Sequence, residues 1–159
     1  MKVTLILVGK TTDKHFDAGI SDYANRIKHY LPFEIDVIPE LKNTKSLSEE
    51  QQKEKEGDQI LKLLGAGDTV VLLDEHGKEM RSIEFAQWLQ KKQAVAKTLV
   101  FVIGGPYGFS PKVYSRADAK ISLSKMTFSH QMVRLIFTEQ LYRACTISKG
   151  EPYHHEELH

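Results

Sequence analysis

Cysteine is nearly absent from this sequence, since Cys145 is the single one in 159 residues. One thiol excludes a disulfide framework, and no group of Cys and His residues has the spacing of a zinc site. Cys145 itself lies in an apolar helical pattern. We therefore predict that Cys145 is a core residue, and we expect no bound metal.

A long hydrophobic run is also missing. No apolar stretch approaches the roughly 20 residues that a membrane-spanning helix needs. The N-terminal MKVTLILVGK holds one short apolar run that ends in Gly9-Lys10, without a small-residue cleavage site. This pattern indicates a buried strand rather than a signal peptide. We expect a soluble, cytoplasmic protein that binds no membrane.

Excess charge of one sign is absent as well, because 22 basic and 21 acidic residues leave a net charge of +1. The late segment 119–150 is nevertheless basic and carries one acid, Glu139. Its basic residues are Lys120, Lys125, Arg134, Arg143 and Lys149. They could form a local face that contacts phosphates, or they could be ordinary surface charge.

What is present is a regular alternation of apolar patterns in a chain short enough to form one compact domain. Short apolar runs predict strands at residues 2–8, 33–38, 69–74, 98–103 and 119–123. Amphipathic helices separate them, and a long one follows at residues 131–147. The alternation predicts an α/β domain with a mostly parallel sheet and helices on both faces.

Several local signals predict where helices and turns begin. Ser46 and Glu49 have the spacing of a capping box, and Ser82 is the predicted cap of the next helix. Ser110 precedes a proline at the first helical position, which is a second capping pattern. After the third strand, His76-Gly77 is expected to turn the chain.

Ligands of open parallel sheets bind at the carboxyl ends of the strands. Here three strand ends are candidates, at Leu73, Gly104 and Leu123. The pair Gly104-Gly105 lets a ligand approach the backbone closely, but neither a Walker motif nor a G-x-G-x-x-G turn is present. A purine beside backbone groups is therefore favoured over a phosphate, and a purely structural turn is the other interpretation.

The last helix and the tail gather reactive side chains. His130 and Arg134 are four residues apart and share a helical face, whereas Arg143 lies on roughly the opposite face. Arg143 therefore either pairs with Glu139 or serves a neighbouring subunit. His154 and its neighbour lie beyond the helix, in the tail.

Two long motifs carry a family resemblance. The runs VFVIGGPYGFS and ISLSKMTFSHQMVRLIFTEQLYRACTISKGEPYHHE resemble the RlmH-type ribosomal large-subunit RNA methyltransferases of the SPOUT superfamily. The segments MKVTLILVGK and VVLLDEHGKEM are similar to the same family. The resemblance implies one domain over residues 1–156. Residues 157–159 are interpreted as a tail that an expression vector could have added.

The resemblance also implies a fold and an activity. The fold is a SPOUT-type α/β domain whose C-terminal segment is threaded into a trefoil knot, which the pattern of strands and helices would not suggest. The cofactor is S-adenosylmethionine in a bent form, and the enzyme is a homodimer. Its substrate is N3 of a pseudouridine in a stem-loop of 23S ribosomal RNA, on assembled ribosomes (70S or large subunit).

Residue roles follow from the same resemblance, motif by motif. The implied cofactor residues are Leu73, Gly104, Gly105, Leu123, Ser124, Lys125, Met126, Thr127, Phe128 and Ser129. His130 and Arg134 are implied to bind the substrate, and Arg143, Tyr153 and His154 to act in catalysis. His155 stands where some relatives carry a basic residue, and it receives no role.

Transfer from a sulfonium needs no metal and depends on holding the methyl carbon and N3 in line. Because N3 attacks well only after losing its proton, a base or an anion-stabilising cation would help, and His154, Tyr153 and Arg143 are the candidates. Two other functions stay open. One is a flavodoxin-type nucleotide-binding module, and the other is a ribosome-associated factor without activity.

Overall fold

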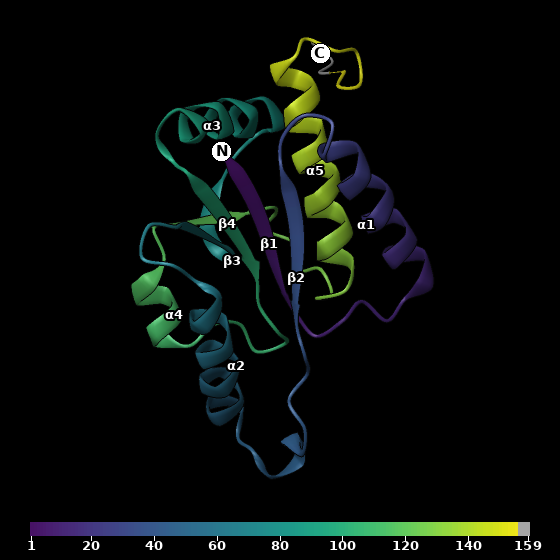
Figure 1. Ribbon diagram of the computed structural model, residues 1–159. Helices are drawn as coiled ribbons and strands as arrows, with labels where there is room; N and C mark the ends of the chain where they lie inside the picture. Colours follow the sequence, from purple (N-terminus) through teal and green to yellow (C-terminus); the bar gives the residue numbers. More distant parts are fainter. Residues whose placement is uncertain (156–159) are drawn as a thin grey trace.

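The protein is a five-stranded parallel sheet between two layers of helices, seen in a computed structural model that describes residues 1–155 (Figure 1). Every paired strand runs parallel to its neighbour, in the order β2-β1-β4-β3-β5. The strands are β1 (Lys2–Val8), β2 (Phe33–Ile38), β3 (Thr69–Glu79), β4 (Thr98–Ile103) and β5 (Ala119–Ser122). The predicted α/β class is thus confirmed.

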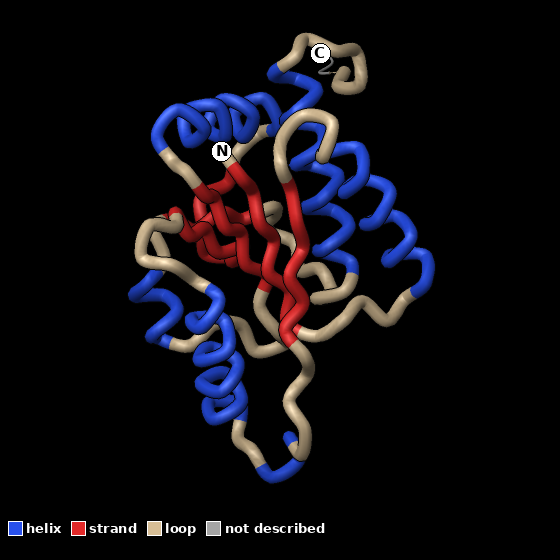
Figure 2. The backbone as a smooth tube through the Cα atoms, in the orientation of Figure 1, coloured by secondary structure: helices blue, strands red, loops and turns tan. Residues whose placement is uncertain are grey.

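The helices cover both faces of the sheet (Figure 2). They are α1 (Lys14–Ile27), α2 (Glu49–Leu63), α3 (Ser82–Val95), α4 (Pro111–Arg116) and α5 (Met132–Ser148), with a 3₁₀ turn η1 (Thr44–Ser46). Buried residues of α1, α3 and α5 pack on one face, and those of α2 and α4 pack on the other. Strands buried from both sides explain why the central ones are almost continuously apolar.

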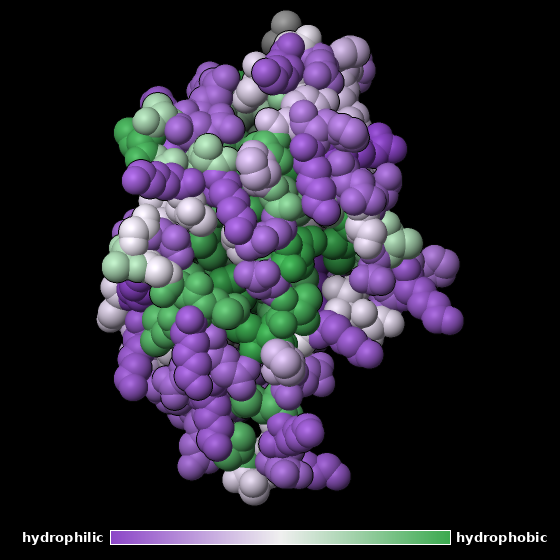
Figure 3. All heavy atoms as spheres, in the orientation of Figure 1, coloured by the Kyte–Doolittle hydropathy of each residue, from purple (hydrophilic) through white to green (hydrophobic). Residues whose placement is uncertain are grey.

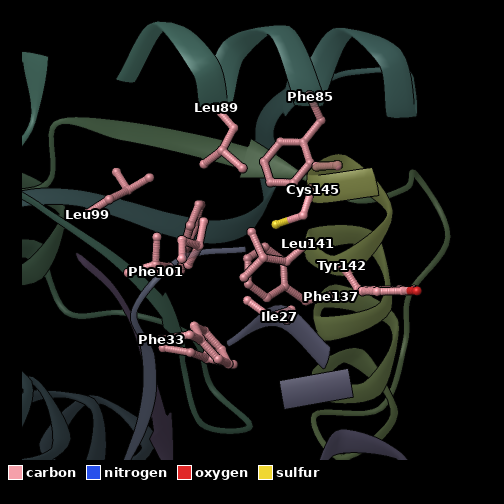
Figure 4. Packing of buried hydrophobic residues seen from close by; sticks show 14 of the residues in the cluster. Ile27, Phe33, Phe85, Leu89, Leu99, Phe101, Phe137, Leu141, Tyr142 and Cys145 are labelled. Atoms are coloured by element: carbon pink, nitrogen blue, oxygen red, sulfur yellow. The ribbon is translucent and has the colours of Figure 1, made fainter. Parts of the chain in front are cut away.

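The larger core layer is built on aromatic rings between α3, β4 and α5 (Figure 4). The rings of Phe101 and Phe137 lie 4.8 Å apart, and Phe85 meets both edge-on. Cys145 is buried in this layer, as predicted. Burial raises the pKa of its thiol to about 12, so the side chain stays neutral and serves as packing.

Strand β3 is longer than predicted, because it continues through His76-Gly77 to Glu79 instead of turning there. The register of its pairing with β5 shifts between Leu73 and Lys78, so that both residues are paired with Ile121. A Cβ on Gly77 would lie 2.6 Å from the backbone nitrogen of Ile121. Gly77 therefore allows β3 and β5 to approach closely where their pairing is irregular, and the turn predicted at His76-Gly77 is wrong.

Two predicted helix caps are wrong and one is confirmed. The capping box before α2 joins Ser48 and Gln51, because Ser46 is used in η1. Helix α3 already includes Ser82, and the Arg81 N–H before it donates to Glu84 Oε1. Ser110 does cap α4, with a proline at the first position.

Hydrophilic side chains cover most of the face seen in Figure 3, around an apolar band that crosses the sheet. None of the helices within residues 1–155 combines the length and apolarity of a membrane span. The predicted trefoil knot and the single-domain boundary at residue 156 stay predictions, and the predicted tail 157–159 lies outside the described residues.

Candidate active site

A cavity of about 770 Å³ lies at the ends of β4 and β5 and beside residues 73–76 in the middle of β3. Its size is typical of sites for small molecules and cofactors. The wall includes His130 and all the predicted cofactor residues except Lys125. These are Leu73, Gly104, Gly105, Leu123, Ser124, Met126, Thr127, Phe128 and Ser129. Three segments predicted at separate strand ends thus line one cavity, although Leu73 lies within β3 because that strand continues to Glu79.

The turn after β4 needs its glycines for structural reasons as well. Gly105 and Gly108 form a bridge across the turn, and Gly108 has a φ of +81°. A Cβ on Gly105 would lie 2.7 Å from Oε1 of Glu56, and one on Gly104 would lie 3.0 Å from the ring of Phe109. The structural and the ligand-binding interpretations of this turn are therefore compatible.

Serine hydroxyls hold the loop after β5 in place. Ser122 Oγ donates to the carbonyl of Ser124, and Ser124 Oγ accepts from the N–H of Met126. Ser129 Oγ accepts from the N–H of Met132 at the start of α5. The side chain of Met126 is left exposed on the cavity wall. The loop thus presents apolar groups to the cavity without being part of a strand or helix.

Asp74 brings a carboxylate to the cavity wall, which sequence analysis did not single out. Its side chain is 6% exposed, and Oδ1 accepts from the N–H of His76. Burial alone would raise its pKa, but the His76 N–H, the hydroxyl of Tyr114 and the charges of His76 and Lys120 outweigh burial and lower it. The signal in the sequence was the single acid that ends the otherwise uncharged run 69–74.

Arg134, the predicted substrate residue, lies inside the protein and is 0% exposed. Its guanidinium donates to the carbonyls of Val8 and Gly9 and to Oγ1 of Thr11. It therefore joins the end of β1 to the start of α5 and presents no surface to an RNA in this chain. The predicted basic face is correspondingly smaller, because Arg143 is also engaged within the protein.

The predicted catalytic residues form a second, separate cluster. Glu139 and Arg143 make the predicted pair, with Arg143 Nη2 2.6 Å from Glu139 Oε1. The hydroxyl of Tyr153 donates to the same oxygen, and Arg143 Nη1 lies 3.0 Å from Nδ1 of His154. This hydrogen-bonded group, Glu139, Arg143, Tyr153 and His154, is called the tail cluster below.

Within one chain the cavity and the tail cluster do not meet. The cavity lies beside the start of α5, and helical rise carries Arg143 roughly 16 Å beyond Met132. In Figure 1 the tail lies at the opposite end of the molecule from the start of α2, whose Glu49 and Lys53 line the cavity. The structure therefore assembles both halves of the predicted site but keeps them apart.

Comparison with known proteins identifies relatives over nearly the whole chain. A family model described as "Predicted SPOUT methyltransferase" matches residues 1–154. Proteins named "Ribosomal RNA large subunit methyltransferase H" are similar: 67% identical in Bacteroides fragilis, 66% in Phocaeicola vulgatus and 56% in Flavobacterium johnsoniae. Each alignment covers 98% of this chain and 100% of the relative. Agreement of this extent, with the cavity and tail cluster both inside the matched region, shows that the chain belongs to the SPOUT methyltransferase family.

Proposed function

We propose that this protein transfers a methyl group from S-adenosylmethionine to N3 of a pseudouridine in 23S ribosomal RNA, acting as a homodimer on assembled ribosomes in the cytoplasm. The single observation that carries the proposal is the cavity beside β3, β4 and β5, lined by almost every residue that the sequence motifs assign to the cofactor. The names of the relatives, which specify the large-subunit RNA, support the choice of substrate.

The cavity suits S-adenosylmethionine in size and chemistry. Its walls combine apolar side chains, such as Leu73, Ile103 and Leu123, with the exposed backbone of the Gly104–Gly108 turn. Apolar faces and backbone polar groups match the flat purine of the cofactor, while the carboxylate of Asp74 suits a hydrogen-bond donor. When bound, the cofactor supplies a methyl group already activated by the sulfonium charge.

The chain's own residues would then orient and stabilise the target base. His130 is exposed at the cavity wall and can contact RNA directly. Arg134 acts indirectly, because its buried guanidinium positions the segment that carries His130 through a bond to the His130 carbonyl. Arg143, Tyr153 and His154 would act on the base through the hydrogen-bonding groups of the tail cluster.

The separation of the two halves of the site supports a homodimer. Methyl transfer requires the base and the cofactor in contact, yet one chain holds the cavity and the tail cluster at different ends of α5. A second copy can bring its tail cluster to the cavity of the first. The symmetric two-chain arrangement would give two such shared sites.

The test is incorporation of labelled methyl groups into RNA. Intact ribosomes are the substrate, and free 23S RNA is the control. We expect incorporation with ribosomes and little with free RNA. Ribosome binding without incorporation would instead identify an inactive ribosome-associated factor. Calorimetry with S-adenosylmethionine, FMN and ATP distinguishes a methyltransferase from a flavodoxin-type nucleotide-binding module. The methyltransferase should bind S-adenosylmethionine, whereas the nucleotide-binding module should bind FMN or ATP instead.

A further inference from the structure

The tail cluster is organised around one carboxylate oxygen. Oε1 of Glu139 accepts from Arg143 Nε at 3.0 Å, from Arg143 Nη2 at 2.6 Å and from the Tyr153 hydroxyl at 2.9 Å. The ring of Tyr153 also stacks against the guanidinium, and Cζ of Arg143 lies 4.8 Å from the centre of the ring. Charge-assisted bonds of this kind are short and directional, so Glu139 holds both partners in a defined orientation.

Tyr153 is unsuited to accept a proton in this arrangement. Its hydroxyl hydrogen is committed to Glu139. Burial, together with the neighbouring Tyr23 and Glu139, raises the pKa of the phenol well above its usual range. Tyr153 therefore stays protonated at neutral pH, which leaves His154 as the remaining candidate base of the cluster.

The contact between Arg143 and His154 decides where the imidazole carries its hydrogen. Arg143 Nη1 lies 3.0 Å from Nδ1 of His154. A guanidinium can donate but cannot accept, so Nδ1 must be the acceptor. A neutral ring that accepts at Nδ1 carries its hydrogen on Nε2. Nε2 is buried and has no hydrogen-bond partner among residues 1–155.

We propose that Glu139, acting through Arg143, fixes His154 in the Nε2–H form, so that His154 donates a hydrogen bond to the target base and does not accept its proton. The proposal rests on the proposed function and deepens it by assigning Glu139 as a positioning residue. An unpartnered buried N–H is costly unless an acceptor arrives, and the bound base can supply one.

The chemistry of the target matches such a donor. Loss of the N3 proton leaves a negative charge shared by the two carbonyl oxygens that flank N3. A preorganised N–H stabilises charge that develops on such an oxygen. The N3 proton then passes to a water molecule, since neither Tyr153 nor Nδ1 of His154 is free to take it. The nitrogen lone pair would form the new bond to the methyl carbon as the carbon–sulfur bond of the donor breaks, and the sulfur would keep that electron pair and leave as a neutral thioether.

The test is the tautomer itself, read from long-range ¹H–¹⁵N NMR spectra of the intact protein without RNA. The His154→Gln variant assigns the signals of His154. We expect the neutral ring of the unmodified protein to carry its hydrogen on Nε2, and the Arg143→Met variant to show a mixture of both forms. Arg143→Lys should restore the Nε2–H form, because an ammonium also only donates.

A kinetic arm tests the positioning role of Glu139. We expect Glu139→Gln to lower the single-turnover methylation rate about tenfold or more, with little change in the affinity for ribosomes, as for loss of a group that acts in the transition state. Glu151→Gln is the matched control, since this nearby tail carboxylate accepts from Tyr30 instead of joining the cluster. Thermal unfolding of both variants checks that each is folded.

The outcomes separate the two proposals. If the unmodified protein methylates ribosomes while His154 carries its hydrogen on Nδ1, this inference is overturned and the proposed function stands. An Nε2–H form that persists in Arg143→Met also overturns it, as does an equal loss of rate in Glu139→Gln and Glu151→Gln. If the unmodified protein transfers no methyl group at all, the proposed function fails regardless of the tautomer.

Discussion

At the scale of single residues, Glu56 of α2 packs a buried carboxylate against Gly105, and this burial costs free energy. The side chain is 6% exposed, and its Oε1 has no hydrogen-bond partner within the described part of the chain. Burial raises the pKa of the carboxyl, although a bond from Gln52 opposes the rise. An ionised carboxylate in this position is unfavourable, yet its oxygens fill the space that a Cβ on Gly105 would need.

The sign of the pH dependence follows from the raised pKa. The folded protein binds the Glu56 proton more tightly than the unfolded chain, so the free energy of unfolding falls as pH rises from about 4.5 through the folded-state pKa. We expect Glu56→Gln to stabilise the protein by about 1 kcal/mol at neutral pH and by less in acid. Thermal unfolding at both pH values measures this, with Glu54→Gln on the same helix as the control. An equal gain at both pH values would contradict the prediction.

Gly77 gives a second prediction at this scale. A Cβ there would lie 2.6 Å and 2.7 Å from backbone atoms of Ile121, which cannot move without disturbing β5. We expect Gly77→Ala to destabilise the fold by about 2 kcal/mol or more, as for overpacking in a core. Gly67→Ala is the matched control, because nothing lies within 4 Å of the added carbon. Denaturant unfolding of both variants decides whether the loss is specific to Gly77.

At the scale of elements, the start of α2 distinguishes two serines that look alike in the sequence. Ser48 Oγ accepts from the N–H of Gln51, whereas Ser46 Oγ donates to the carbonyl of Asn43 in η1. We expect Ser48→Ala to cost about 1 kcal/mol of stability, the usual value for a lost N-cap, and Ser46→Ala to cost clearly less. Urea unfolding curves of the two variants compare them directly, and a larger loss for Ser46→Ala would refute the assignment.

Sequence patterns predicted the bounds of the strands that pair regularly along their whole length. The strands β1, β2 and β4 have the predicted bounds. β1 and β4 are buried on both faces and almost continuously apolar, whereas β2 is an edge strand in which Glu34 and Asp36 interrupt the apolar residues. The second half of β3 could not be predicted, since residues 75–79 are polar and lie at an irregular pairing. The cavity residues were predictable from strand ends, but the burial of Arg134 depends on carbonyls more than a hundred residues away.

At the scale of the whole molecule, sharing of sites between subunits can be tested by complementation. Thr127→Trp places a bulky ring on the cavity wall and leaves the tail cluster intact. Arg143→Ala disrupts the tail cluster and leaves the cavity intact. Each variant alone should be inactive. Mixed and reassembled, they should recover about a quarter of the activity, because half the dimers carry one complete site of two. Methyl incorporation measures recovery.

The control for complementation is a mixture of Arg143→Ala and His154→Ala chains. Both changes damage the same cluster, so this mixture should stay inactive. Native mass spectrometry confirms that mixed dimers have formed in each case. If mixed dimers of the first pair form and transfer no methyl group, each site lies within one chain and the shared arrangement is wrong.

The strand order also determines when this chain can fold during its own synthesis. β1 lies between β2 and β4 in the sheet. The first strand to leave the ribosome therefore cannot complete its pairing until β4, which is synthesised much later, has emerged. Such distant pairings fold slowly and leave strand edges open in the meantime. A nascent chain released before Thr98 would expose one edge of β1 and is expected to aggregate or to be degraded.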